Sequence, residues 1–515
     1  MGTPQDLDRE IDLLTFQIRE AAIASTPVNN NDHIKCDHLK LPTEIVNLIR
    51  DKRKARKKMT TTRFETDKRE YNKINKIVQK RINAFRNEKF EKFLSGLGAR
   101  EIDDYSLWKA TKYLKRPAQI SLPIRDKDGN WAKNSTDKAD VLASHLENVF
   151  KPNKLDEDEM IEVEDNKINL ENIRFLPDKK TNKISYDEIF NEIKYKTKLR
   201  KAPGFDLVSG IIVKQLPACA IRKLVAIFNA VIKLQYVPLQ WKKAEIIVIL
   251  KSGKPSAQPS SYRPISLLPI LGKLFEKLYI KRLIKIVNKK GLIINEQFGF
   301  RAKHGTLEQL HRVTNFVEKA LEKGHYCNGV FLDVAQAFDK VNHQRLITKL
   351  SSMLPGNHTR LIASYLTDRF FRVRFEDAYS EFKPIRAGVP QGSVLSPLLY
   401  SLFTADIPKP KGNSLMGIFA DDTSVFASAP SYEQTVEILQ ESLDDIQDWT
   451  DADGTKLNAT KSENVVFALR NYVHIPLVLN GEAVPHVDKA RYLGLIMDAK
   501  LKYKEHILKK KNKSN

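Results

Sequence analysis

Residues 431–449 have the spacing of an amphipathic helix. Ser431 and Gln434 form the pattern of a capping box, which favours a helix that begins at this point. The apolar positions that follow recur on one helical face: Val436, Leu439, Leu443, Ile446 and Trp449. The adjacent aspartates Asp444 and Asp445 then fall on the polar face of the helix, where solvent accommodates both charges.

A second pair of aspartates lies in the sequence GIFADDTSVFA, residues 417–427, where the flanking pattern is that of strands. Apolar residues on both sides predict two short buried strands, with Asp421 and Asp422 at the turn between them. Adjacent buried carboxylates are costly unless a cation or hydrogen-bond donors compensate for their charge. The pair is therefore either a solvated hairpin tip or a metal site.

From about residue 165 onward, helical and strand patterns alternate irregularly. Residues 244–254 (AEIIVILKSGK) predict a strand followed by a loop, and residues 264–287 (PISLLPILGKLFEKLYIKRLIKIV) have a helix-like pattern. Residues 327–350 (CNGVFLDVAQAFDKVNHQRLITKL) predict a strand, a turn and a helix. The order lacks the regular alternation of a doubly wound parallel sheet, so we predict an α+β fold.

The first 150 or so residues predict a helical and strongly basic region. Apolar residues at helical spacing lie between lysines and arginines: Tyr71, Ile74, Val78, Ile82, Phe85 and Phe93. The preceding residues 51–58 carry six cations in eight positions: Lys52, Arg53, Lys54, Arg56, Lys57 and Lys58. Such a run is usually a solvated helix face, but beside a basic amphipathic helix it equally favours binding to nucleic-acid phosphates.

Composition narrows the class of partner. The chain has 515 residues, 42% of them hydrophobic and 29% charged, which fits a globular protein of two to four domains. The net charge of +23 favours a polyanion, either nucleic acid or an acidic membrane surface. Because no apolar run approaches the length of a membrane span and no signal-peptide core is visible, nucleic acid is the better prediction. The three cysteines are far apart, which excludes a disulfide framework and suits a reducing, intracellular compartment.

Asp333 adds a third carboxylate to the candidate chemistry. It follows the apolar run Val330–Leu332 and is expected at the end of a buried strand. Alone, it would be interpreted as a helix N-cap or turn residue. Together with Asp421 and Asp422, however, it suits two-metal phosphoryl transfer, which needs carboxylates that converge from neighbouring strands. Oxygen ligands without nearby His or Cys favour Mg²⁺ or Mn²⁺ over zinc.

Several motifs around these aspartates resemble those of reverse transcriptases from non-LTR (LINE-type) retrotransposons, most closely the Jockey clade of arthropod elements. The resemblance covers about residue 40 to the C-terminus. In chain order, the motifs are KAPGFD (201–206), the segment 241–278 that contains SYRPIS, NEQFGFRAKHGT (295–306), LDVAQAFDKV (332–341), AGVPQGSVLSPLLYSLF (387–403), FADD (419–422), GTKLNATKSE (454–463) and RYLGLIMD (491–498). Each motif alone is weak, but together, in the order of the family, they are specific.

The resemblance implies roles for the carboxylates and for two other motif residues. Asp333 and Asp421 would ligate two Mg²⁺ (or Mn²⁺) ions, and Asp422 would add charge and positioning. Phe338 matches the sugar gate whose ring excludes a 2′-hydroxyl; the alternative is a core aromatic on the following helix. Gln391 lies in a rigid turn, with Gly388, Pro390 and Gly392, that approaches the nucleotide or template.

The resemblance also assigns cations to phosphates. Arg263 and either Lys251 or Lys254 would contact the triphosphate of the incoming nucleotide, where charge accumulates during transfer. Arg301 would be a second phosphate or template contact. Lys461 would neutralise or protonate the departing pyrophosphate. For each of these cations, an ordinary surface position is the alternative.

The family fold implies a right-hand polymerase with fingers and palm. We expect a helical basic N-terminal extension (1–155), an acidic linker (156–165), a fingers-rich part (166–325), a palm (326–480) and a palm/thumb junction (481–515). Residues 1–150 do not resemble the endonuclease that family members usually carry. The chain ends soon after the Tyr-Leu-Gly motif, which predicts a truncated thumb.

The predicted function is an RNA-directed DNA polymerase that extends a primer 3′-hydroxyl on an RNA template. Its partners would be an RNA template, a DNA primer and deoxynucleoside triphosphates, with no membrane, in the nucleus and/or cytoplasm. The alternative is a catalytically weak or inactive nucleic-acid-binding remnant, because a shortened thumb would weaken the clamp on the duplex. A polymerase of another template class is a third reading, which Phe338 and the fingers motifs disfavour.

Overall fold

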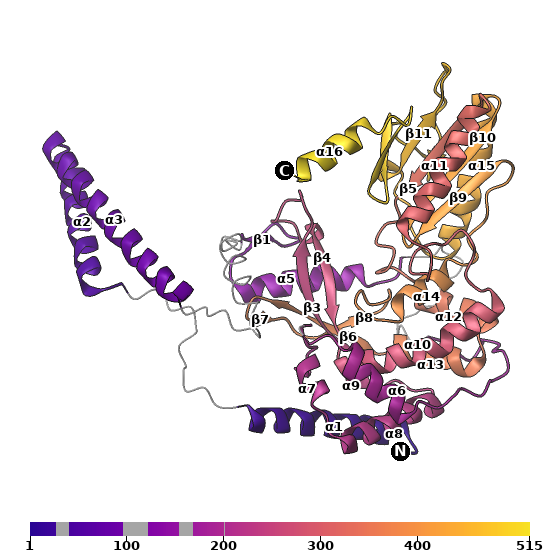
Figure 1. The fold of residues 1–515 in the computed structure, drawn as a ribbon, viewed down its shortest axis with the longest axis horizontal. Helices are drawn as coiled ribbons and strands as arrows, with labels where there is room; N and C mark the ends of the chain where they lie inside the picture. The colour runs from indigo at the N-terminus through magenta and orange to yellow at the C-terminus, as the bar shows by residue number, and fades with distance from the viewer. Residues whose placement is uncertain (27–40, 96–121, 154–167, 200, 515) are drawn as a thin grey trace. The chain divides into compact units, whose positions relative to one another are not determined.

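The computed structural model describes residues 1–26, 41–95, 122–153, 168–199 and 201–514 (Figure 1). The chain divides into two compact units, one made of residues 1–24 and 122–515 and the other of residues 25–121. The predicted acidic linker, 156–165, lies outside the described residues. The larger unit contains both helices and antiparallel sheets, which confirms the predicted α+β class.

A four-stranded antiparallel sheet forms one half of the larger unit. Its strand order is β11-β5-β10-β9, with bounds β5 (Tyr326–Leu332), β9 (Ser414–Phe419), β10 (Asp422–Ala429) and β11 (Glu463–Phe467). Helix α15 (Tyr432–Ala452) packs on one face through Leu439 and Leu443, and α11 (Thr306–Glu322) packs on the other through Val313 and Val317. Both faces are covered because the strands are apolar on both sides.

The local predictions for this sheet hold closely. The hydroxyl of Ser431 accepts a hydrogen bond from the backbone N–H of Gln434 and caps α15, which confirms the Ser431 half of the predicted capping box. The predicted hairpin is β9–β10, but its turn is one residue earlier than expected. Asp422 is already paired with Phe419, so the turn residues are Ala420 and Asp421.

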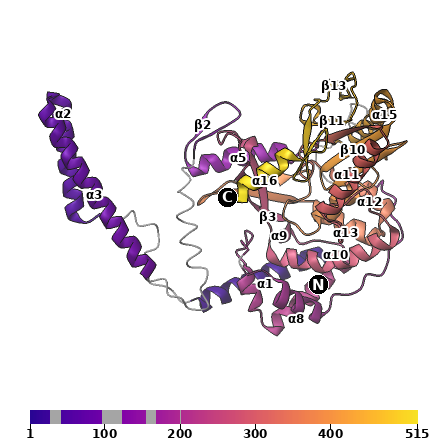
Figure 2. The same ribbon diagram turned by 45° about the horizontal axis from the view of Figure 1, so that its top comes forward.

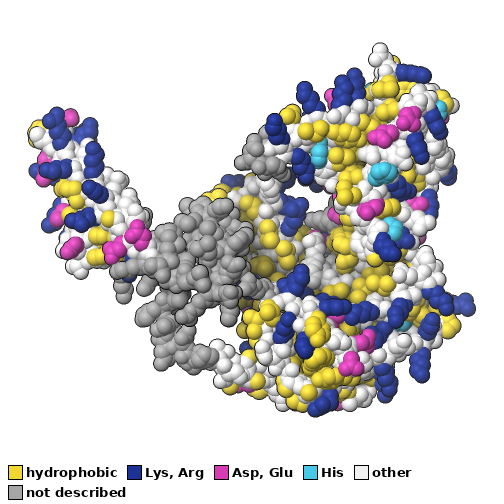
Figure 3. Space-filling view, viewed as in Figure 1, with side chains coloured by type: hydrophobic (Ala, Val, Ile, Leu, Met, Phe, Trp, Pro, Cys, Tyr) yellow, Lys and Arg dark blue, Asp and Glu magenta, His cyan; other side chains and the backbone are white. Residues whose placement is uncertain are grey.

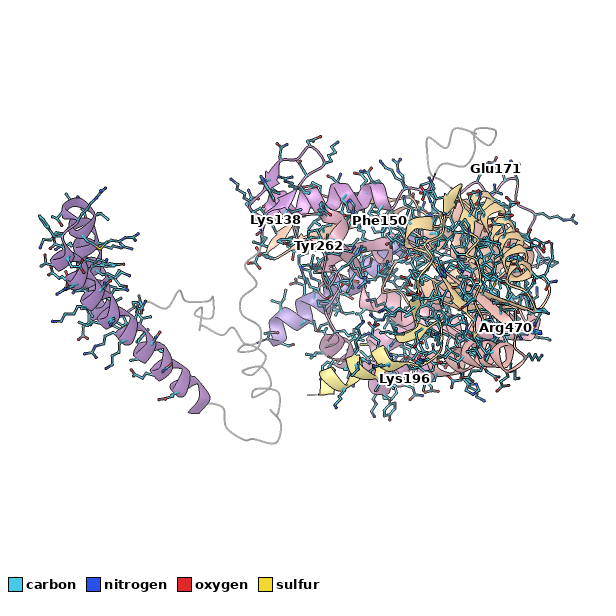
Figure 4. All side chains as sticks on the ribbon, turned by 90° about the horizontal axis from the view of Figure 1, so that it is seen from above. Lys138, Phe150, Glu171, Lys196, Tyr262 and Arg470 are labelled. Atoms are coloured by element: carbon cyan, nitrogen blue, oxygen red, sulfur yellow. The ribbon has the colours of Figure 1, made fainter. Side chains whose placement is uncertain are left out.

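A five-stranded sheet forms a separate layer of the larger unit. It contains β3 (Lys243–Leu250), β4 (Tyr262–Leu267), β6 (Arg369–Phe375), β7 (Ala378–Tyr379) and β8 (Lys383–Ile385). Strand β3 pairs parallel with β6 and antiparallel with β4. Helix α5 (Ser135–Val149) covers one face, and Figure 4 labels two residues of this layer, Phe150 and Tyr262.

The helix-like pattern predicted over 264–287 is wrong at its beginning. Residues 262–267 are strand β4, and the helix α10 (Ile270–Lys290) starts only after Pro269. A residue that precedes proline is disfavoured in the helical region, so Leu268 keeps an extended backbone and the helix begins afterwards. Pairing with β3, which local periodicity does not reveal, fixes 262–267 as a strand.

A hydrophobic core made mainly of helices forms a further part of the larger unit. It is formed by α8 (Ala218–Leu234), α10, α12 (His343–Met353), α13 (Gly356–Leu366), α14 (Ser396–Phe403) and the N-terminal helix α1 (Pro4–Ser25). Helix α1 lies beside α8 in both Figure 1 and Figure 2, and buries Leu7 and Ile11 completely. The carboxylate of Asp8 accepts hydrogen bonds from the Tyr236 hydroxyl (2.8 Å) and the Leu239 N–H (2.9 Å). The first helix of the chain is thus part of this core.

The remaining elements of the larger unit lie between these layers in the chain or follow them. They are β1 (Ile124–Arg125), β2 (Trp131–Ala132), α6 (Tyr186–Asn191), a π-helical turn (Glu192–Lys196), α7 (Gly210–Lys214), α9 (Leu239–Lys242), β12 (Val478–Leu479), β13 (Glu482–Ala483), β14 (Lys489–Tyr492), β15 (Leu495–Asp498) and α16 (Lys504–Ser514), with 3₁₀ turns at Pro259–Ser261 and Ala459–Lys461. Among the described residues, no helix combines the length and apolar character needed to cross a bilayer.

The smaller unit is a helical hairpin. Its helices are α2 (Thr43–Thr62) and α3 (Glu65–Ser95), joined at Arg63, whose backbone is left-handed (φ 56°). Val78 of the predicted apolar stripe is buried between them. Lys and Arg side chains gather along both sides of this hairpin in Figure 3. The helical and basic character predicted for this stretch is confirmed over residues 43–95.

Candidate active site

Strand pairing brings three carboxylates to the same end of the four-stranded sheet. Strand β10 pairs with β5 so that Thr423 lies opposite Leu332. One step further in this register, Asp422 lies across from Asp333, and Asp421 precedes it in the β9–β10 turn. Because neighbouring antiparallel strands are about 5 Å apart, this register sets the three residues close together at the ends of β5 and β10.

The electrostatics of this cluster favour a cation. Asp422 keeps an exposed surface, yet crowding by protein atoms raises its pKa, and the charges of Asp421 and Asp333 raise the pKa further. Lys461 Nζ lies 3.7 Å from a carboxylate oxygen of Asp333. Within the described part of the chain, no three acidic, His or Cys side chains are gathered as closely as the ligands of a bound metal. The donors are nevertheless hard carboxylate oxygens at an open site, which fits Mg²⁺ or Mn²⁺.

A cavity of about 860 Å³ opens beside these carboxylates, between the ends of the two sheets. Of the residues predicted from sequence, it is lined by Asp333, Asp421, Lys251, Lys254, Arg263, Phe338, Gln391 and Lys461. These residues come from β3–β4, the end of β5, the loop before α14, the β9–β10 turn and the loop before β11. The fold therefore gathers residues that are more than 200 positions apart in the sequence.

The cations on the cavity wall repel one another. Burial lowers the pKa of Lys251, and the neighbouring charges of Arg263 and Lys461 lower it further. Lys251 Nζ is held by the Ser260 carbonyl at 2.9 Å, while Lys254 and Arg263 are exposed. A polyanion in the cavity would relieve this repulsion, so this part of the cavity wall is suited to bind phosphates. Lys251 and Lys254 both line the cavity, so both remain candidates.

Phe338 is half-buried with one side on the cavity. Its ring stacks on Tyr400, with centroids 4.4 Å apart and planes 23° apart, and meets Phe300 edge-on at 6.1 Å. The Phe338 carbonyl accepts a hydrogen bond from Val389 N–H at 2.8 Å. The ring therefore packs against the core and also forms part of the cavity wall, and it does so from a turn, because the following helix α12 begins only at His343.

Gln391 is held by a residue to which the sequence assigned no role. Its side-chain amide donates hydrogen bonds to both carboxylate oxygens of Asp339, at 2.9 and 3.0 Å. Asp339 is 7% exposed, and burial raises its pKa to about 6. It follows Phe338 directly in the motif LDVAQAFDKV, but its orientation toward Gln391 depends on a contact across 52 residues.

The turn around Gln391 needs its glycines. Gly388 has φ 89°, and an added Cβ would lie 2.6 Å from the Asp339 carbonyl oxygen. Gly392 has φ 124°, and its Cβ would lie 2.6 Å from the Ser266 carbonyl oxygen. Only glycine fits both the left-handed backbone and the close approach, so the turn is fixed against β4 and against Asp339.

Arg301 and the basic run on α2 do not line the cavity. Arg301 donates a hydrogen bond to the Ile294 carbonyl at 3.2 Å, although its neighbour Phe300 is on the cavity wall. The predicted cations 52–58 belong to the smaller unit. Most of them are exposed, and Lys58 forms ion pairs with Asp67 (2.9 Å) and Glu70 (3.8 Å).

The chain is similar in sequence to a known protein family. Residues 249–497 match the family described as reverse transcriptase (RNA-dependent DNA polymerase). The matched range contains both the three carboxylates and the cavity cations. This part of the chain is therefore similar to reverse transcriptases.

Three of the similar proteins are mobile-element polymerases of Drosophila melanogaster. The chain is 35% identical over 512 residues to "Probable RNA-directed DNA polymerase from transposon X-element", and 36% identical over 509 and 518 residues to the polymerases of mobile element jockey and transposon BS. Each alignment covers 98% of this chain but only 55–56% of the relative, so the chain spans just over half the length of these proteins. The predicted resemblance to non-LTR, Jockey-type enzymes is confirmed.

Among solved structures, an apo telomerase from Candida tropicalis is similar over 50% of this chain and 54% of its own, with a TM-score of 0.36 and 15% identity.

Proposed function

We propose that the larger unit is an RNA-directed DNA polymerase that extends a primer 3′-hydroxyl on an RNA template with deoxynucleoside triphosphates. The supporting observation is that carboxylates at the strand ends of one sheet and cations on the other sheet share a single cavity. In a right-hand polymerase, the four-stranded sheet would be the palm, largely within 326–480. The sheet built on β3 and β4 would belong to the fingers, within 166–325, with strands β6–β8 added from the later range.

Asp333 and Asp421 would hold two Mg²⁺ or Mn²⁺ ions, with Asp422 beside them. When bound, such ions activate the attacking hydroxyl and stabilise charge on the leaving oxygens. The protein contributes the fixed placement of the carboxylates. Asp333 is tied in place by its N–H, which donates to the Ser462 hydroxyl (3.1 Å), and by its carbonyl, which accepts from Asn458 N–H (2.9 Å).

The cations would bind the phosphates of the nucleotide. Lys251, Lys254 and Arg263 lie on the wall formed by β3, β4 and their loop, where they would hold the triphosphate and orient it toward the carboxylates. Lys461 contacts Asp333 and is 65% exposed, so its ammonium is free to turn toward pyrophosphate as it leaves. In the active complex, Asp333 would be bound to a metal ion and would no longer hold Lys461.

Phe338 would select the sugar. Its ring is fixed from behind by Tyr400, so it cannot rotate away from a ribose 2′-hydroxyl without loss of that stacking. Gln391, anchored by Asp339, would present its remaining polar surface to the nucleotide or template strand. Arg301 would contact phosphate or template outside the cavity. These placements extend the predicted roles into one binding mode for a deoxynucleotide.

The α2 cations would bind the nucleic-acid backbone, because a run of mostly exposed lysines and arginines attracts phosphates at long range. A template and primer of this kind place the protein inside the cell, in the nucleus and/or cytoplasm.

Primer extension on poly(rA)/oligo(dT) with Mg²⁺ and dTTP tests the proposal. The unmutated chain should incorporate dTTP, and Asp421→Asn should lower kcat by at least about 10²-fold, because a lost metal ligand removes several kcal/mol of transition-state stabilisation. Asp444→Asn is the matched control, since that Asp-Asp pair lies on the exposed face of α15. Absence of incorporation by the unmutated chain would favour the alternative of a binding protein without synthesis. Equal activity of Asp421→Asn would contradict the site.

A further inference from the structure

A short segment, residues 296–298, runs alongside the hairpin that carries the aspartates. The Ile418 N–H of β9 donates to the Glu296 carbonyl (3.0 Å), and the Phe298 N–H donates to the Ile418 carbonyl (2.8 Å). These bonds form a single parallel bridge between Gln297 and Ile418, near the end of β9. The segment lies in the motif NEQFGFRAKHGT, in which only Arg301 had an expected role.

Gln297 reaches from this segment to the β9–β10 turn. Its side chain is fully buried, and its Oε1 accepts hydrogen bonds from the N–H groups of Gly299 (2.7 Å) and Ala420 (3.0 Å). Backbone N–H groups only donate, so the amide oxygen, and not the nitrogen, must face them. Among the described residues, Gln297 Nε2 has no hydrogen-bond partner. The side chain therefore serves to satisfy two buried backbone donors.

The turn that Gln297 contacts has an unfavourable backbone. Ala420 has φ 61°, in the left-handed region, at a position of a two-residue hairpin turn where glycine is usual. A non-glycine residue there costs about 1 kcal/mol or more and persists where the surroundings enforce it. Gly299 allows the segment to approach the turn this closely, because a Cβ at position 299 would lie 2.2 Å from Ala420 N.

We propose that Gln297 is a positioning residue for polymerisation, which holds the strained Ala420 turn so that Asp421 and Asp422 stand at the end of the sheet in the geometry that binds the ions and substrate. This inference rests on the proposed function. Gln297 contacts no cavity surface and acts only through the turn. Without its oxygen, two buried N–H groups lose their partner, and the turn is free to relax and shift both carboxylates.

The test compares Gln297→Leu, which removes the acceptor, with Gln297→Glu, which keeps an acceptor oxygen at the same place. Gln309→Leu is the matched control. Gln309 is equally buried against the same sheet, but its amide donates to the Tyr492 hydroxyl and does not touch the turn. The measurements are hydrogen exchange of peptides that contain Ala420, thermal unfolding, and kcat and KM for dTTP in primer extension.

We expect Gln297→Leu to accelerate exchange at Ala420 about tenfold and to lower kcat about 10- to 100-fold, with KM for dTTP changed less than about threefold. Gln297→Glu should restore the protection of Ala420. Gln309→Leu should lower the unfolding temperature while kcat and exchange at the turn stay at the unmutated values. If Gln297→Leu fails to fold, Gly299→Ala displaces the same turn and should reproduce the loss of kcat.

Unchanged exchange and kcat in Gln297→Leu would overturn the positioning role, as would an equal loss of kcat in Gln309→Leu. Failure of the proposed function is distinct from either outcome. In that case the unmutated chain incorporates no nucleotide, and hydrogen exchange at Ala420 still decides whether Gln297 holds the turn.

Discussion

The side-chain amide of Gln391 donates hydrogen bonds to both carboxylate oxygens of Asp339, which lies directly after Phe338 in the chain. The pair ties the loop before α14 to the turn after β5. Asp339 is buried, and its only described hydrogen-bonded side-chain partner is Gln391. Gln391 therefore depends on Asp339 for its orientation in the cavity.

Replacement of Asp339 should weaken nucleotide binding more than it alters the chemical step. Asp339→Leu removes both acceptors, so the amide of Gln391 loses its anchor, and we expect KM for dTTP to rise roughly tenfold. Asp339→Asn keeps one acceptor oxygen and should change KM less than about threefold. Steady-state primer extension measures both values. Equal KM in the two variants would show that Gln391 does not need this partner.

A smaller side chain at position 338 should relax sugar selection. Phe338→Leu removes the ring that Tyr400 supports, so we expect the preference for dTTP over UTP in kcat/KM to fall at least about tenfold. Phe300→Leu is the matched control, because Phe300 lines the same cavity and contacts Phe338 only edge-on. If only Phe300→Leu lowers the preference for dTTP over UTP, Phe338 is not the sugar gate.

Buried His343 should make stability depend on pH between about 6.5 and 4. Its Nε2 donates to the Gly388 carbonyl at 2.7 Å, and burial lowers its pKa to about 4, while an unfolded histidine titrates near 6.5. The unfolded state thus binds a proton that the folded state excludes. The contribution of neutral His343 to the free energy of unfolding is complete above pH 6.5. It declines as the pH falls and changes no further below about 4.

His343→Gln should flatten this dependence. Between pH 7.5 and 5, we expect the unmutated protein to lose roughly 2 kcal/mol of unfolding free energy through this histidine, and the variant to lose correspondingly less. Urea unfolding at both values measures the difference. His358, buried and with its pKa lowered by burial to about 4, should contribute in the same direction, so a residual slope is expected. His311→Gln, at an exposed position on α11, is the control.

The basic run on α2 should appear in the salt dependence of nucleic-acid binding. Replacement of Arg53, Lys54, Arg56 and Lys57 by Gln should reduce the slope of log K against log salt by up to about 0.9 for each cation that contacts a phosphate of duplex DNA. Fluorescence anisotropy over a salt series measures the slope. Lys58→Gln should have a smaller effect, because Lys58 already pairs with Asp67. An unchanged slope in the fourfold variant would make this run an ordinary solvated face.

Local patterns predicted much of the fold correctly. The capped helix at 431–449, the strand at 243–250 and the hairpin at 414–429 follow from periodicity and capping, which act over a few residues. The strand at 262–267 was missed because it is fixed by pairing with β3, and the docking of α1 because its partners are more than 200 residues away. Strands β6–β8 likewise join a sheet begun more than 100 residues earlier.

The same division applies to the site. The sequence by itself determined the residue types: aspartates at the ends of apolar strands, cations in the neighbouring motifs, and motifs in the order of the reverse transcriptase family. Only the tertiary structure decided which other residues support the residues of the site. Asp339 meets Gln391, and Gln297 meets Ala420, across 52 and 123 positions of the chain. Strand register and burial set these contacts, and both are properties of the assembled sheets that no local pattern contains.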